Sequence, residues 1–84
     1  MPLGDRLRRE RLRKGWGVRE LARLSRVRYA LISELETGKK DDTTGRNLKR
    51  LARVLGVSVD YLLGTFEDND QGDGAPVGAA LVGA

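Results

Sequence analysis

The stretch that decides the fold is LKRLARVLGVSVDYLLG, residues 48–64. Its first half carries four apolar side chains at the i, i+3, i+4 and i+7 positions of one helix face, namely Leu48, Leu51, Ala52 and Leu55. Gly56 ends this pattern, and Ser58, a residue type that caps helices well, begins a shorter apolar pattern that stops at Gly64. With Thr44 as the cap of the first segment, the stretch predicts two helices, at 45–55 and 59–63.

The residues before this stretch have the same helical spacing, which predicts three more short helices at 4–14, 18–25 and 29–37. In the first of them we expect an inner stripe of Leu3, Leu7, Arg11 and Leu12, with the arginines Arg6, Arg8, Arg9 and Arg13 in solvent. We expect Trp16, in the connection that follows, to fill a gap in the core. No segment alternates with period two for long enough to favour a strand, so the predicted fold class is all-α.

Composition excludes several kinds of site. The 84 residues include no cysteine and no histidine, which removes disulfides, the usual zinc ligand sets and histidine-based catalytic triads. No paired carboxylates, nucleophile–base set or phosphate-cradling loop stands out, so we expect no enzyme, no cofactor, no metal and no small-molecule ligand. No apolar run approaches the ~20 residues that span a bilayer, so we expect a cytoplasmic protein without a membrane partner.

Charge is divided unevenly along the chain. Residues 1–64 hold all 16 Lys and Arg against eight acidic residues, a net charge of +8, whereas residues 65–84 hold four acidic residues and no base, a net charge of −4. A basic domain of this size favours a polyanionic partner, although a solvated surface that merely happens to be basic has the same composition. The acidic segment would partly oppose the attraction.

The composition also changes at residue 65. Residues 67–75 are polar and Gly-rich without periodicity, and residues 76–84 are small and mostly apolar. We therefore divide the chain into a helical domain, residues 1–64, and an acidic, Gly-rich tail, residues 65–84. Two interpretations of the tail stay open: a disordered segment, or an arm that docks on a second subunit.

Several motifs of the helical domain belong together. They are Leu7-x-x-x-Arg11-Leu12, Lys14-Gly15-Trp16, Glu20-Leu21-Ala22, the run 32–39 (ISELETGK) and the stretch quoted first. Over residues 3–64, about three-quarters of the chain, they resemble the helix-turn-helix domain of the Cro and phage-repressor type, the XRE family. The resemblance implies a five-helix, lambda-repressor-like DNA-binding domain.

The resemblance assigns 18–25 and 29–37 as the two helices of the motif, with the second as the recognition helix in the major groove. Ile32 and Leu35 then face inward and Leu31 lies at the rim. The remaining side chains are the candidates for base contact: Arg28, Tyr29, Ala30, Ser33 and Glu34. Arg28 could bond guanine, whereas Glu34 needs cytosine N4 or a nearby Arg as a partner. The alternative for each is an ordinary exposed side chain.

Phosphate contacts are expected at both ends of the motif, from Arg19, Thr37, Lys39, Lys40 and Arg46. The sequence departs from the family pattern where Gly17 and Val18 replace a Ser or Thr cap and a phosphate-binding Gln. It departs again where Arg26 replaces a turn Gly, and a left-handed backbone there would cost on the order of 1 kcal/mol.

The resemblance also implies a structural ion pair between Arg11 and Glu36. Because losing one partner of such a pair leaves the other charge without compensation, we expect Glu36→Ala to reduce thermal stability more than Arg11→Met does.

The predicted function is a sequence-specific regulator of transcription, a repressor that binds a palindromic operator in double-stranded DNA as a homodimer, of bacterial, phage or plasmid origin. We expect the dimer interface at Tyr61, Leu62 and Phe66. The alternative is a protein-interaction module, antitoxin-like or anti-repressor, that keeps the fold and reads little DNA. Val18 and Glu34 favour that alternative.

Overall fold

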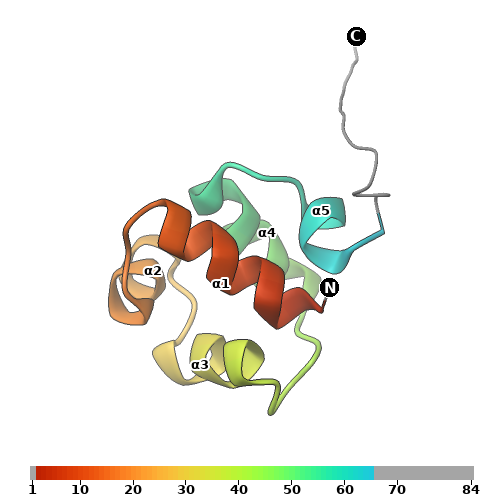
Figure 1. Cartoon of the computed structure of the whole chain (residues 1–84), viewed down its shortest axis with the longest axis horizontal. Coiled ribbons are helices and arrows are strands. Elements are labelled where there is room, and N and C mark those ends of the chain that lie inside the picture. The colour runs from red at the N-terminus through yellow and green to blue at the C-terminus, as the bar shows by residue number, and fades with distance from the viewer. Residues whose placement is uncertain (1, 66–84) are drawn as a thin grey trace, which may run out of the picture.

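The computed structural model describes residues 2–65, which form five α-helices and no strand (Figure 1). The helices are α1 (Leu3–Arg13), α2 (Val18–Ser25), α3 (Tyr29–Thr37), α4 (Gly45–Leu55) and α5 (Val59–Leu63). Every boundary lies within one residue of its predicted position, so the all-α, five-helix class is confirmed. The tail predicted for residues 65–84 lies outside the described range apart from Thr65.

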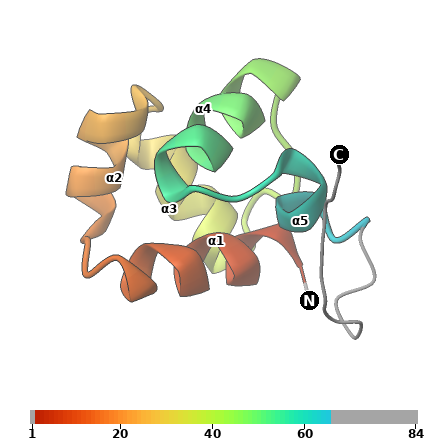
Figure 2. The same cartoon turned by 90° about the horizontal axis from the view of Figure 1, so that it is seen from above.

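The five helices enclose one apolar core. Figure 2 shows α2 and α5 at opposite ends, with α1 and α4 on opposite sides between them. Side chains from all five helices and from the α2–α3 turn make up the core: Leu3, Leu7, Leu21, Val27, Leu31, Ile32, Leu35, Leu48, Leu51, Ala52, Leu55 and Leu62. Trp16 packs against this cluster while staying partly exposed, close to its expected role.

Polar capping side chains set where α4 and α5 begin, and glycines set where α3, α4 and α5 end. The Asn47 N–H donates to Thr44 Oγ1 at 3.2 Å, and the Tyr61 N–H donates to Ser58 Oγ at 2.9 Å, so both predicted caps are confirmed. Gly38, with φ 84°, ends α3 in the left-handed conformation that favours glycine.

The sidedness predicted for α1 is wrong at two positions. Leu12 is 55% exposed and Arg6 only 2% exposed. At 3.6 residues per turn, Leu12 lies about 140° around the helix from Leu7, so it cannot share the buried face of Leu7. Arg6 faces α5 instead of solvent, and its guanidinium lies 5.1 Å from the centre of the Tyr61 ring. The aromatic face therefore shelters the arginine that hydropathy alone placed outside.

Gly4 sets how closely α1 approaches α3. A Cβ at this position would lie 1.9 Å from the carbonyl oxygen of Leu35, far inside van der Waals contact. The start of α1 thus rests directly on the end of α3. Within the part of the chain that the structure describes, no helix has the length and hydropathy of a membrane span.

Candidate nucleic-acid interface

The turn between α2 and α3 orients the two helices of the motif. The N–H of Val27 donates to Ser25 Oγ at 3.2 Å, and both residues are buried. Between them Arg26 has φ 62° and ψ 31°, so the left-handed backbone considered from the sequence is present on a non-glycine residue. Such a residue costs about 1 kcal/mol relative to a relaxed backbone, and packing of Val27 holds it in place.

Helix α3 has one buried face and one exposed face. Ile32, Leu35 and Leu31 are at most 6% exposed, so Leu31 belongs to the core and its predicted place at the rim is wrong. Leu31 is buried because it lies next to Ile32 on the side of α3 that α1 and α2 cover. On the opposite side Arg28, Tyr29 and Ala30 are exposed, while Ser33 and Glu34 are half-buried. The outer side of α3 is therefore most exposed at the start of the helix.

The start of α2 meets the start of α3 through one ring contact. The guanidinium of Arg19 lies 4.8 Å from the centre of the Tyr29 ring, and Tyr29 is 46% exposed. Sequence reasoning named both residues but not their contact, because ten positions across a turn follow no helical period. Val18, beside Arg19, packs its side chain against the core.

Two arginines of α2 differ in whether a carboxylate pairs with them. Arg23 donates to Glu20 at 2.6 Å, and this hydrogen bond and the carboxylate charge raise the pKa of Arg23 above its ordinary value. Arg19 has no carboxylate within salt-bridge distance among residues 2–65. Its positive charge is thus available to an outside partner.

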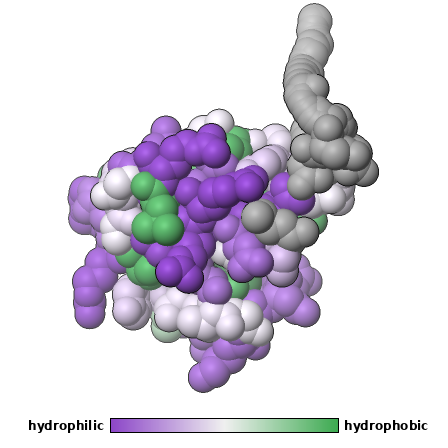
Figure 3. Space-filling view, in the orientation of Figure 1, coloured by the Kyte–Doolittle hydropathy of each residue, from purple (hydrophilic) through white to green (hydrophobic). Residues whose placement is uncertain are grey.

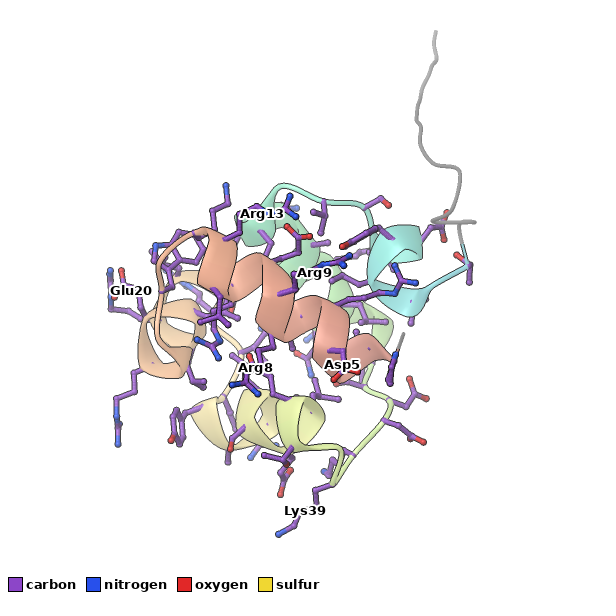
Figure 4. The ribbon with its side chains drawn as sticks, viewed as in Figure 1. Asp5, Arg8, Arg9, Arg13, Glu20 and Lys39 are labelled. Carbon is purple, nitrogen blue, oxygen red and sulfur yellow. The ribbon has the colours of Figure 1, made fainter. Side chains whose placement is uncertain are left out.

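Predicted phosphate ligands at the end of α3 fall into two groups. The ammonium of Lys40 lies 3.6 Å from Glu34 Oε1, and Thr37 Oγ1 donates to the Glu34 carbonyl at 3.3 Å. Glu34 is therefore paired with a lysine, where the sequence suggested an arginine or a base. Lys39 extends from the molecule beyond α3 (Figure 4) and has no carboxylate partner in the described range. Arg46 is exposed on the first turn of α4.

The pair implied between Arg11 and Glu36 is present and joins α1 to α3. Arg11 donates from Nε and Nη2 to the two carboxylate oxygens of Glu36, each at 2.7 Å, and from Nη1 to the carbonyl of Trp16 at 2.7 Å. The hydrogen bond to Glu36 raises the pKa of Arg11, and the carboxylate charge adds to the rise while burial opposes it. The third bond, to Trp16, was not predicted.

The three residues predicted for the dimer interface differ in how the structure places them. Leu62 is fully buried in the core, so it cannot serve as a dimer contact, because the short helix α5 turns it toward α1 and α4. Tyr61 is partly buried; its hydroxyl donates to Glu10 Oε2 at 2.8 Å and accepts from Arg9. Phe66 lies outside the described residues. Leu63, which was not predicted, is 42% exposed.

The face carrying α1 is also strongly polar. Figure 3 shows many hydrophilic side chains on it, with smaller hydrophobic areas among them, and Figure 4 places Arg8, Arg9 and Arg13 along this helix. Arg9 and Arg13 lie within 4.0 Å of Glu10, which is almost buried. Part of this basic charge is thus neutralised within α1, unlike that of Arg19 and Lys39.

Comparison with known proteins gives a consistent result. The N-terminal DNA-binding domain of SinR from Bacillus subtilis has 30% identity and a TM-score of 0.70, over 71% of this chain and 87% of that one. The P22 c2 repressor in complex with a synthetic operator has 30% identity and a TM-score of 0.69, over 75% and 94%. The SinR–SinI complex matches at 28% identity and a TM-score of 0.70, over 80% and 69%. No curated protein sequence matches the chain.

A family model described as Helix-turn-helix matches residues 7–62, the range that contains the α2–α3 turn, the exposed first turn of α3 and the Arg11–Glu36 pair. The chain therefore belongs to the Cro and phage-repressor type, or XRE, family of helix-turn-helix proteins, whose fold is that of DNA-binding regulators.

Proposed function

We propose that this protein is a transcriptional repressor that binds a palindromic operator in double-stranded DNA through the outer face of α3. The observation that carries the proposal is the two-sidedness of α3. Its inner side is locked into the core by Ile32 and Leu35, while Arg28, just before the helix, and Tyr29 and Ala30 on its first turn are exposed. An α-helix held in this way fits the major groove with its N-terminal residues against base edges.

The flanking charges support the same orientation. Lys39 is exposed just beyond the end of α3, and Arg46 is exposed on the first turn of α4. Contacts from these two cations to phosphates would fix how α3 sits in the groove without reading sequence. Ser33 and Glu34 would contribute less, because they are half-buried and Glu34 is paired with Lys40.

We infer a homodimer because one copy offers a single recognition helix, which reaches too few base pairs for useful specificity. Successive major grooves on one side of a duplex lie roughly 34 Å apart. A second copy related by a two-fold axis would place a second α3 one turn along the duplex. We place the dimer contact at α5, where Leu63 is exposed, and in the segment that follows it.

The role as a repressor, in the cytoplasm and without catalytic activity, is supported by the family and by the similarity to the P22 c2 repressor bound to its synthetic operator. The described residues contain no cluster of three or more His, Cys, Asp or Glu side chains suited to a metal ion.

Selection of bound duplexes from a random DNA pool tests the proposal. We expect a two-fold-symmetric consensus, and a log–log plot of affinity against salt with a negative slope of several units. A pool that yields no enriched sequence, or a consensus without symmetry, would overturn the palindromic-operator proposal.

One observation favours a second candidate, a protein-interaction module. The chain is similar, at a TM-score of 0.70, to a chain of a solved complex of SinR with SinI, so a protein that contains a domain of this fold takes part in a complex with another protein. Such a module would leave duplex DNA unbound even at low salt, whereas a repressor would bind it there most tightly.

A further inference from the structure

Arg19 and Tyr29 form a cation–π pair on the exposed side of the motif. Their side chains come from the first turns of two different helices, α2 and α3, and meet with the guanidinium 4.8 Å from the ring centre. Both residues are exposed, Tyr29 to 46%. A long arginine side chain in solvent has many conformers, and stacking on a fixed ring reduces that number before any partner binds.

No carboxylate within residues 2–65 forms an ion pair with the Arg19 guanidinium. Glu20, the acidic residue next to Arg19 in the sequence, accepts both of its hydrogen bonds from Arg23, at 2.6 and 3.3 Å. In a stacked cation–π contact the ring covers one face of a planar guanidinium, and the N–H groups at the guanidinium edge stay available to donate.

The position of the stack decides which DNA groups it reaches. Because Tyr29 is the first residue of α3, a side chain that rests on its ring is drawn from the start of α2 toward the start of the recognition helix. In this motif the first helix crosses the phosphate backbone, and the first turn of the second helix meets base edges. The ring therefore moves the cation from the region of phosphates to the region of bases.

We propose that the Arg19–Tyr29 stack reads one guanine in each half-site, with the arginine edge donating to guanine O6 and N7. This inference rests on the proposed function and adds a specificity determinant to it. Guanine is the base that offers two major-groove acceptors spaced for a planar guanidinium fork. Tyr29 is a positioning residue here, because its ring sets where the arginine edge points.

The test compares base selectivity, rather than affinity alone, across matched variants. Wild-type protein and Arg19→Ala are each used in the random-pool selection, and each is titrated with the wild-type consensus carrying 7-deazaguanine at the candidate guanine of both half-sites. Removing N7 should weaken wild-type binding about tenfold or more per half-site and leave Arg19→Ala binding almost unchanged. Arg23→Ala is the control, since Arg23 lies one turn further along α2 and is paired with Glu20.

Two substitutions of the ring separate stacking from other roles of Tyr29. Tyr29→Phe keeps the ring and should keep the guanine preference, even if loss of the hydroxyl changes overall affinity. Tyr29→Leu removes the aromatic face, and the preference should fall toward that of Arg19→Ala. All of these positions are exposed, and an unchanged melting temperature for each variant verifies that it is folded.

Other outcomes overturn the inference in distinguishable ways. If Arg19→Ala weakens binding equally for all four bases and lowers the salt slope by about one, Arg19 contacts a phosphate and the guanine proposal is wrong. If both ring variants keep the preference, the stack has no role in reading. If the wild-type protein enriches no sequence at all, the proposed function itself is overturned.

Discussion

At the scale of single residues, Gly4 determines how α1 meets α3. A methyl group there would collide with the Leu35 carbonyl oxygen at 1.9 Å, and that oxygen belongs to the backbone of α3, so it cannot rotate away. We predict that Gly4→Ala destabilises the fold by about 3 kcal/mol, at the upper end of overpacking costs, although alanine is the better helix former.

Thermal denaturation followed by circular dichroism measures this effect, and Gly45→Ala is its control. Gly45 also lies at the start of a helix, but no atom stands within 4 Å of a Cβ there. The control should be neutral or gain about 0.5–1 kcal/mol. Equal melting temperatures for Gly4→Ala and Gly45→Ala would contradict the close contact between α1 and α3.

At the residue scale, the sequence predicted contacts between residues a few positions apart and missed contacts between different helices. The caps Thr44 and Ser58 were predictable because each bonds a backbone group three residues on. Gly4 and the Arg19–Tyr29 contact were not, since their partners lie on other helices and no spacing in the sequence encodes them.

At the scale of elements, the Arg11–Glu36 pair holds α1 against the end of α3. The sequence led to the expectation that Glu36→Ala is the costlier change. The structure reverses it, because Arg11 also donates to the Trp16 carbonyl. Arg11→Met leaves both the carboxylate, whose side chain is 7% exposed, and that carbonyl without their donor. We predict a loss of roughly 3–5 kcal/mol for Arg11→Met and a smaller loss for Glu36→Ala.

Urea denaturation of the two variants measures the difference, with Arg23→Ala as a control that breaks an exposed pair and should change the stability little. A larger loss for Glu36→Ala than for Arg11→Met would show that the bond to Trp16 contributes nothing.

Helix existence and limits were the most predictable features at this scale, because apolar spacing and capping residues act along one segment. Which side of each helix is buried was harder to predict. On α1, Leu12 is exposed because it lies about 140° around the helix from Leu7. Arg6 is buried because α5 offers it an aromatic face, and that face belongs to a helix more than fifty residues away. Leu62 was misassigned for the same reason: its burial depends on how α5 packs.

At the scale of the whole molecule, charge is separated between residues 1–64 and the acidic residues that follow. We predict that neutralising Glu67, Asp68, Asp70 and Asp73 to Gln and Asn raises affinity for the selected duplex about two- to fivefold at low salt. The reason is long-range attraction between the protein and DNA, which these four charges oppose. The gain should shrink as salt shortens the screening length, and equal affinities at low salt would exclude the effect.

The central claim is that α3 presents its outer face to the duplex, and one charge-matched comparison of equilibrium affinities tests it directly. Arg28→Ala removes a charge at the start of α3, and Arg13→Ala removes the same charge from the end of α1, on the side away from α3 (Figure 4). With the selected operator, Arg28→Ala should lower affinity about tenfold or more and Arg13→Ala less than about twofold. Equal losses, or a larger loss for Arg13→Ala, would contradict the claim.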